Sequence, residues 1–463
     1  MSIAVSSSPF LPRRRPSVAS LWVYAPLLMA LVLRVMPGGI GNVSYLLLAG
    51  YALLGRAHAI RALAMLWLFN MLGVPAPSAA SVGRYAVLFA AAASALLYSE
   101  FLSKRPKLRP FTQATVFLGL FLIVHSLLFS PIVDVSALKA LSWTLAMATL
   151  VSAWSGLSPG ERLQVEHQLF WGLVLVLLVS LPMAALPFGY QRNGSGFQGI
   201  LNHPQAFGPT MALLGAWAAA RMFGEAKPGW WLLGLAGACV ILVLMSQART
   251  AGLAMVGGVA LSILIAPSFA GRSIGRMVPG LRSKRLWTVI GAMLIVGVAF
   301  APRIAETVGY YITKAGRVEA SSFAEIYDRS RGRLMNAMLE NIAEQPLTGI
   351  GFGIASEPWT MEVSRDPFLG LPTGASIEKG VTPLMVLEEV GIFGAMLVAL
   401  WLFRLLRSGA RSGLAPFAVC STALLLNMGE ATLFSPGGLG LLPMILLAWA
   451  YAGGTTGYYP RHG

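Results

Sequence analysis

The candidate chemistry of this sequence lies in cations that stand outside its long apolar runs. Arg249 follows Ser246-Gln247-Ala248 at the start of one apolar run, where a helix N-terminus already carries partial positive charge. An arginine there complements nothing in the helix, so a phosphate or diphosphate is a natural partner, with a lipid headgroup as the alternative. Other polar segments hold further cations that could bind the same anion: Arg192, Arg329, Arg331, Arg333 and Lys379.

Candidate acids and bases are fewer. Glu378 stands in the sequence SIEKG directly before an apolar run, so it could act as a general base, or simply as a carboxylate at a helix entry. His203 lies in the sequence NHP before another run, where a lone histidine is more often a cap or a polar packing group than a catalyst. Glu388 and Glu389 begin the apolar run after the longest polar segment and are further candidates.

Two other kinds of site are not expected. Gly194, Gly196 and Gly199 spell G-x-G-x-x-G, but a dinucleotide fingerprint must follow a strand, and this one follows an apolar helical run. We interpret it as a turn whose N–H groups could cradle an anion together with Arg192. Cys239 and Cys420 both lie in apolar runs, which supports neither a disulfide scaffold nor a zinc site. We expect no metal and no cofactor.

The elements that must position these residues are membrane helices. The chain has 463 residues, of which 56% are hydrophobic and 11% charged, and its mean hydropathy is +0.70. Soluble domains carry about 25% charged residues, so this composition indicates a polytopic membrane protein. The net charge of +16 would suggest nucleic acid in a soluble protein, but here loop Lys and Arg that fix topology explain most of it, and no nucleic-acid partner is expected.

Apolar runs that approach the roughly 20 residues needed to cross a bilayer recur along the whole chain. They predict an all-α bundle of about 14 transmembrane helices, with 12 to 14 as the range. We expect helices near residues 19–36, 40–54, 58–73, 82–101, 112–129, 136–155, 166–186, 204–222, 230–246, 250–268, 286–302, 383–406, 412–432 and 436–452.

Basic residues alternate along the chain in the way that fixes membrane orientation. Clusters at Arg13–Arg15, 103–109 and 272–285 fall in alternate loops, and the short loops between them are nearly free of Lys and Arg. Because cytoplasmic loops carry the excess of basic residues, we expect both termini in the cytoplasm. The long polar segment Arg303–Thr382 is then extracytoplasmic. Residues 1–302 would form helices 1–11, and residues 383–463 helices 12–14.

Three cations lie near the expected outer ends of apolar runs, namely Arg34, Arg84 and Lys139. Charged residues at such positions are functional candidates. Long basic side chains at helix ends also reach the interface without a further role, and we favour that interpretation for these three.

The long polar segment has its own local pattern. Residues 331–345 have helical composition, with an apolar stripe of Leu334, Met338, Ile342 and Ala343, which predicts a short amphipathic helix on the outer bilayer surface. Arg329, Arg331 and Arg333 would precede or open this helix. Pro346 ends it, and the sequence GIGFG at 349–353 predicts tight turns.

With these motifs in place, the chain resembles the superfamily of O-antigen polymerases and O-antigen ligases. The resemblance extends from about Leu186 to Gly394. It rests on the loop from Arg192 to His203-Pro204, the SQAR segment, Arg331 followed by Pro346-Leu347-x-Gly349-x-Gly351, and the closing sequence VLEEVGIFG. Each motif is short, and their order around one large outer loop makes the whole pattern specific.

This resemblance implies a glycosyltransferase of the bacterial inner membrane whose active site faces outward. Its donor would be a polyprenyl-diphosphate-linked glycan and its acceptor a glycan or a lipid, with membrane lipids around it and a chain-length regulator and a flippase as further partners. No metal is implied. Arg249 would stabilise the leaving diphosphate together with the other cations, and Glu378 would deprotonate the acceptor hydroxyl.

One departure from the family pattern bears on the reaction. Ligases of this family carry a His-Asn-type pair where this chain has Gly380-Val381, so that histidine is absent and Glu378 could replace it. We therefore favour polymerisation of an exopolysaccharide or O-antigen-like repeat over transfer to a lipid acceptor. A transporter or flippase of lipid-linked sugars is the alternative from another class, and a non-catalytic membrane scaffold is a third.

Overall fold

The computed structural model describes residues 18–37, 39–98, 109–190, 196–299, 323–365, 370, 372–375 and 379–455. The first part of the chain contains α1 (Val18–Val35), α2 (Ile40–Ala52), α3 (Arg56–Met71), α4 (Ala80–Leu97), α5 (Pro110–Phe129), α6 (Val133–Gly156), α7 (Pro159–Ser180), η2 (Leu181–Ala185) and η3 (Pro187–Tyr190). The middle part contains α8 (Pro204–Gly224), α9 (Trp230–Met245), α10 (Arg249–Leu264), α11 (Ala266–Ala270), α12 (Ile274–Met277), η4 (Pro279–Arg282) and α13 (Lys284–Ala299). The last part contains α15 (Phe323–Glu344), η5 (Pro358–Thr360), β1 (Val363–Arg365), β2 (Pro372–Ala375), α16 (Thr382–Ser412), α17 (Leu414–Leu426) and α18 (Leu441–Thr455).

The architecture is that of a membrane-embedded helical protein. Five described helical segments are long and apolar enough to cross a bilayer: α4, α5, α6, α16, and α7 together with η2. Six shorter helices are also apolar: α1, α2, α9, α10, α17 and α18. Each apolar run expected from the sequence coincides with a described helix. Among the described helices that coincide with an expected run, however, α3, α8 and α13 fall into neither apolar group, so the number of spans stays a prediction.

Local sequence explains where several helices begin. Proline at the first turn starts α5, α7, α8 and α16, because its fixed φ suits a helix and its missing N–H is not needed there. The start of α7 also has a capping box. The Ser158 hydroxyl accepts from the Glu161 N–H at 3.4 Å, and the Glu161 carboxylate accepts from the Ser158 N–H at 3.0 Å.

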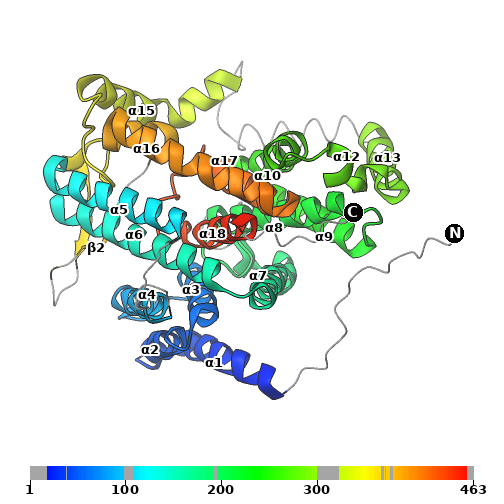
Figure 1. The fold of residues 1–463 in the computed structure, drawn as a ribbon, viewed down its shortest axis with the longest axis horizontal. Coiled ribbons are helices and arrows are strands. Elements are labelled where there is room, and N and C mark those ends of the chain that lie inside the picture. Colours follow the sequence, from blue (N-terminus) through cyan, green and yellow to red (C-terminus); the bar gives the residue numbers. More distant parts are fainter. Residues whose placement is uncertain are drawn as a thin grey trace.

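The helices run up and down between two ends of the molecule. At one end, the Arg56 guanidinium at the start of α3 donates to the carbonyl oxygens of Gly156 and Tyr98, at the ends of α6 and α4. At the other end, the Asn202 N–H donates to the carbonyl oxygen of Met71, where α3 finishes. Figure 1 shows α15 and β2 at the opposite end of the bundle from α12 and α13. Which end faces the cytoplasm stays a prediction from the charge pattern.

The core of the bundle is organised around α18. This helix is apolar all round and packs against α3, α6, α16 and α17, so nearly all of its side chains are buried. Trp449 of α18 packs against Trp217 of α8, with ring centroids 4.2 Å apart. The last of the described helices therefore occupies the centre of the fold rather than its edge.

The long polar segment differs from expectation in two respects. α15 spans 22 residues and begins at Phe323, so Arg329, Arg331 and Arg333 lie inside the helix rather than before it or at its start. β1 and β2 form a two-stranded antiparallel sheet in the same segment, so the fold is nearly all-α and not purely so. The apolar stripe is partly correct. Met338 is buried and α15 packs against α16, whereas Ala343 is exposed.

Candidate functional site

A break inside α16 organises the end of the molecule that carries α15. Gly391 has a φ of 62° and a ψ of −174°, so the helix is interrupted there. Two carbonyl groups freed by the interruption accept bonds from the segment after α15. The Glu388 oxygen accepts from the Ile350 N–H at 2.8 Å, and the Glu389 oxygen accepts from the Gly351 N–H at 3.0 Å. The Ile392 N–H in turn donates to the Pro346 oxygen at 2.9 Å. The polar segment thus completes the backbone pairing of a broken helix.

Glycine is required on both sides of this contact. A Cβ atom at Gly391 would lie 2.1 Å from the Leu347 carbonyl oxygen, and one at Gly349 would lie 2.6 Å from the Glu388 carbonyl oxygen. Both glycines also have positive φ, a conformation that costs other residues free energy. The GIGFG sequence is therefore a close backbone contact as well as a set of turns.

The break holds a buried ionic cluster, which we define as Lys379, Glu388 and Glu389. The Lys379 ammonium lies 2.6 Å from Glu388 Oε2 and 3.1 Å from Glu389 Oε1, and all three side chains are at most 1% exposed. The Asn341 amide of α15 donates to Glu388 Oε1 at 2.7 Å, and the Gly353 N–H donates to Glu389 Oε2 at 2.7 Å. Buried charges need such partners, and here each carboxylate has an ionic partner and a hydrogen-bond donor.

Lys139 of α6 connects this cluster to a cavity. It interacts electrostatically with Glu389, and its ammonium lies 5.6 Å from the centroid of the Phe352 ring. Lys379 thus pairs with both carboxylates, and Lys139 interacts with one of them, Glu389. Lys139 also lines the neighbouring cavity, so it can be reached by a ligand there.

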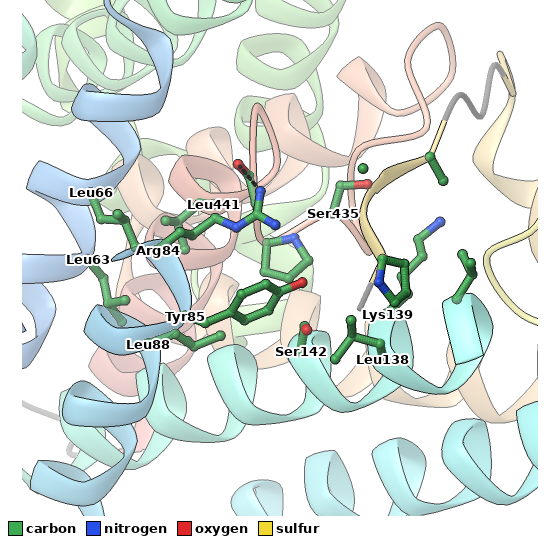
Figure 2. A pocket seen from close by; sticks show the side chains of 16 residues that line it. Leu63, Leu66, Arg84, Tyr85, Leu88, Leu138, Lys139, Ser142, Ser435 and Leu441 are labelled. Carbon is green, nitrogen blue, oxygen red and sulfur yellow. Dashed lines mark hydrogen bonds between the residues drawn. The ribbon is translucent and has the colours of Figure 1, made fainter. Parts of the chain in front are cut away.

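This first cavity, which we name the leucine-walled cavity, has a volume of about 250 Å³. Arg84 of α4 and Lys139 of α6 reach it from different helices, and Tyr85, Ser142 and Ser435 supply hydroxyl groups (Figure 2). Its apolar wall includes five leucines: Leu63, Leu66, Leu88, Leu138 and Leu441. A cavity with two cations and an apolar wall is suited to an amphiphilic anion.

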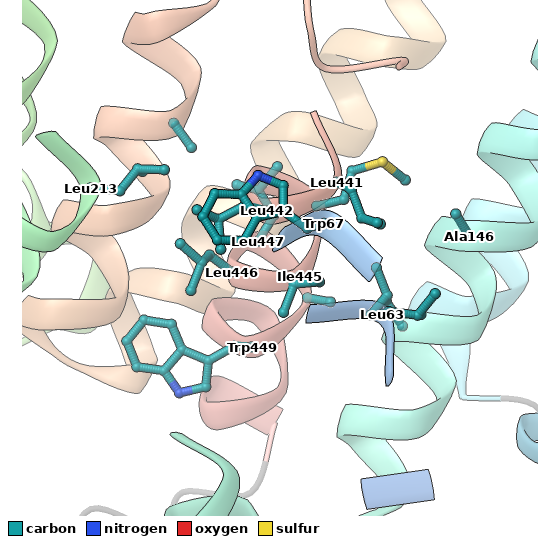
Figure 3. Packing of buried hydrophobic residues seen from close by; sticks show 14 of the residues in the cluster. Leu63, Trp67, Ala146, Leu213, Leu441, Leu442, Ile445, Leu446, Leu447 and Trp449 are labelled. Atoms are coloured by element: carbon teal, nitrogen blue, oxygen red, sulfur yellow. The ribbon is translucent and has the colours of Figure 1, made fainter. Parts of the chain in front are cut away.

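The wall is part of the main core. Leu63, Leu441 and Trp67 belong to the same packed cluster as Leu442, Ile445 and Leu446 of α18 (Figure 3). Leu63 and Leu441 are at most 1% exposed. Close packing of this kind holds the cavity in one shape, because core side chains occupy single rotamers with few voids between them.

A second cavity, the amide-lined cavity, has a volume of about 640 Å³ and shares Arg84 and Gly437 with the first. The Arg84 guanidinium donates to the Gly437 carbonyl oxygen at 3.4 Å, at the boundary between the two. Asn70, Gln198 and Asn202 contribute side-chain amides to its lining. Arg34 also lines it. The Arg34 guanidinium donates to the carbonyl oxygens of Pro75, Phe69 and Val74 at 3.0, 3.1 and 3.4 Å.

The cations near helix ends therefore differ from expectation. Arg34 is 2% exposed and its guanidinium binds backbone carbonyls, so it does not reach outward to the interface. Arg84 and Lys139 line a common cavity. The signal in the sequence was the presence of charge within apolar runs, which usually marks an interior or functional position. The sequence did not reveal Asn341 or His125, whose Nε2 lies 2.6 Å from the Thr348 carbonyl oxygen.

The residues that the sequence proposed for the site are described only in part. Arg192 and Glu378 lie outside the described residues, as do the side chains of Arg329, Arg331 and Arg333. Their convergence with Arg249 on one anion therefore stays a prediction. Arg249 does begin α10, and it is absent from the lining of both cavities described above. Lys379, Glu388 and Glu389 come together as the ionic cluster.

His203 has the capping position that was weighed against a catalytic role. It is the N-cap of α8, and its Nδ1 accepts from the Gln205 N–H at 2.9 Å. Such a bond satisfies one of the free N–H groups at a helix start. The capping contact does not by itself test the catalytic alternative.

Among the described residues, no three His, Cys, Asp or Glu side chains gather in a way that could hold a metal ion. The described groups can bind an anion electrostatically through Arg84 and Lys139, and the leucines can pack against an apolar chain attached to it. Comparison of the chain with protein-family models and with curated proteins finds no match.

Proposed function

We propose that this chain is a membrane glycosyltransferase that uses a polyprenyl-diphosphate-linked glycan as donor at the outer face of the bacterial inner membrane. Polymerisation of an exopolysaccharide or O-antigen-like repeat is the reaction we favour. The observation that supports this proposal most directly is the leucine-walled cavity. Arg84 and Lys139 line this cavity from two different helices, together with five leucines (Figure 2).

A polyprenyl diphosphate has the matching chemistry. Its diphosphate needs cations, and an arginine can bind phosphate oxygens in a bidentate manner. Its isoprene units need an apolar surface, which leucines provide. A soluble nucleotide sugar would have no use for the leucine wall. This combination favours a lipid-linked donor over a nucleotide-linked one.

The proposed reaction breaks the bond between the anomeric carbon of the donor sugar and the diphosphate oxygen. The acceptor hydroxyl oxygen forms the new glycosidic bond and passes its proton to a base, for which Glu378 is our candidate. The electron pair of the broken bond stays on the diphosphate, which leaves on its carrier. Arg84 and Lys139 stabilise this negative charge as it develops, and Arg249 and Arg192 are further candidates for the same role.

Reconstitution tests the proposal. The purified chain is placed in liposomes with lipid-linked oligosaccharide extracted from a strain that lacks the gene. We expect longer glycan to form and sugar-free polyprenyl diphosphate to be released. Arg84→Gln and Lys139→Met should each lower the rate strongly, whereas Arg407→Gln, an exposed arginine in the C-terminal half of α16, should leave it unchanged.

Two results would contradict the proposal. One is movement of intact lipid-linked sugar across the bilayer with no glycan transfer, which would identify a transporter. The other is full transfer activity in both Arg84→Gln and Lys139→Met, which would remove the leucine-walled cavity from the reaction. A strain without the gene should also accumulate single repeat units on the carrier, as expected when polymerisation is lost.

A further inference from the structure

The amide-lined cavity has unused hydrogen-bonding capacity. Among the described residues, the Asn70 amide makes one bond, from Nδ2 to the Gly437 oxygen at 3.2 Å, and the Asn202 amide makes one, from Nδ2 to the Asn70 carbonyl oxygen at 3.2 Å. Each amide has two N–H donors and a carbonyl oxygen that can accept two bonds. The Oδ1 atoms of both asparagines are therefore available to a ligand. The Ser81 hydroxyl in the same lining has no protein partner within the described part of the chain.

The charge in this cavity is largely committed to the protein. Arg34 directs its guanidinium to three backbone carbonyl oxygens, which fix it in place. Arg84 lies at the boundary shared with the leucine-walled cavity. The remaining polar lining is neutral: amides, hydroxyls and backbone carbonyls. Such groups match a ligand rich in hydroxyls better than they match a second anion.

The size and place of the cavity agree with that chemistry. Its volume of about 640 Å³ lies within the roughly 300–1,000 Å³ of small-molecule sites. It adjoins the leucine-walled cavity at Arg84 and Gly437. The lining thus changes in order from leucines, through a cation, to neutral amides. A lipid-linked glycan has its parts in the same order: isoprenoid, diphosphate, sugar.

We infer that the amide-lined cavity binds the glycan of the lipid-linked donor, with the diphosphate held at Arg84 between the two cavities. This inference rests on the proposed function and adds a position for the sugar. A site built to hydrogen-bond hydroxyl groups discriminates strongly against ligands that lack them, because its polar groups are then left unpaired. The neutral amides therefore give this cavity a role in selecting the repeat unit as well as in binding it.

Cysteine reporters test the two cavities separately. The chain has two cysteines, Cys239 and Cys420, both fully buried, so an introduced cysteine is labelled without background. Ser81→Cys places a thiol in the amide-lined cavity, and Ser435→Cys places one in the leucine-walled cavity; both positions are partly exposed. The rate of maleimide labelling is measured in detergent with two probes. One is sugar-free polyprenyl diphosphate, and the other is lipid-linked oligosaccharide from the deletion strain.

The sugar-free probe should slow labelling at Ser435→Cys and leave Ser81→Cys unchanged. The glycan-bearing probe should slow labelling at both sites, by about tenfold when its concentration is about ten times its Kd. Protection at Ser435→Cys by both probes with no protection at Ser81→Cys would overturn the placement of the glycan while leaving the proposed function intact. Protection of neither site by either probe would overturn both.

A steric variant provides an independent measurement. Ala76 is exposed at the lining of the amide-lined cavity, so Ala76→Trp should fill its mouth without disturbing the core. Ala79→Trp, on the same loop but outside the lining, is the matched control. Ala76→Trp should raise the KM for the glycan-bearing donor at least about tenfold while binding of sugar-free polyprenyl diphosphate stays unchanged. Equal KM values in the two tryptophan variants would contradict the inference.

Discussion

Replacing Lys379 by methionine should destabilise the protein through the buried ionic cluster. Methionine keeps most of the length of the side chain and removes its charge. Glu388 and Glu389 would then keep the Asn341 amide and the Gly353 N–H as donors, but would lose the ammonium group at 2.6 and 3.1 Å. Because both carboxylates are at most 1% exposed, water cannot take the place of that ammonium group.

These distances set the scale of the stability that Lys379→Met would lose. At an effective dielectric constant of about 20, unit charges 2.6 and 3.1 Å apart attract by roughly 6 and 5 kcal/mol. Desolvation of the three groups offsets most of this attraction. Removing one partner of a buried pair nevertheless costs about 3–5 kcal/mol, because a buried charge is left uncompensated. Lys379→Met should lower the free energy of unfolding by an amount in this range. That is a large part of the roughly 5–15 kcal/mol that a typical protein has.

Thermal unfolding in detergent measures this effect, and Lys227→Met provides the control. Lys227 is exposed, so its replacement should change stability by less than about 0.5 kcal/mol. Lys379→Met should lower the unfolding midpoint by several degrees relative to Lys227→Met. The combined variant Lys379→Met with Glu388→Gln should recover part of the loss, since it removes one uncompensated charge. Equal midpoints for the two single methionine variants would refute the reasoning.

Three further predictions concern topology, the base and the helix break. In intact spheroplasts, an impermeant maleimide should label Glu362→Cys, whereas Arg276→Cys should react only after permeabilisation, because the charge pattern places these exposed residues on opposite sides. Glu378→Gln should lower the transfer rate by about 100- to 10,000-fold with donor binding retained, whereas His203→Ala should lose only a helix cap, about 1 kcal/mol of stability. Gly391→Ala should cost at least about 1–3 kcal/mol of stability in thermal unfolding, because its φ is positive and its Cβ would meet the Leu347 oxygen.

Each of these has an outcome that would count against it. Labelling of Arg276→Cys in intact spheroplasts would reverse the orientation. Loss of turnover in His203→Ala, with Glu378→Gln active, would transfer the role of base to the histidine. For the helix break, Gly172→Ala is the control, since a Cβ there meets nothing within 4 Å and alanine suits a helix interior. A Gly391→Ala protein as stable as the Gly172→Ala protein would show that the break tolerates a side chain.

The sequence predicted the helices well because membrane helices are specified locally. Continuous apolar runs bounded by proline, glycine and basic residues fix the positions of these helices within a few residues. The start of α15 was less predictable, because residues 323–330 contain several charges and no clear apolar stripe. The arginines at 329, 331 and 333 were consequently expected before or at the start of the helix rather than inside it.

The site was less predictable because it depends on contacts between distant segments. Lys139 and Lys379 both interact with Glu389 although they are far apart in the chain, and no local pattern indicates that pairing. The break at Gly391 lies inside an apolar run that reads as continuous helix. Only the structure shows that the Glu388 carbonyl and the Ile392 N–H pair with the backbone of Ile350 and Pro346 instead of with partners inside the helix.

The position of α18 has a consequence for biogenesis. This helix follows α3, α6, α16 and α17 in the chain and leaves the ribosome after them, yet Leu446, Leu447 and Trp449 are buried among helices that were made earlier. Until it arrives, α3, α6, α16 and α17 lack the surface against which they pack. The leucine-walled cavity, of which Leu441 forms part, is incomplete for the same interval. The bundle therefore closes from the inside only after α18 has been made, and a nascent chain stopped before Leu441 lacks both the centre of the bundle and part of the wall of the leucine-walled cavity.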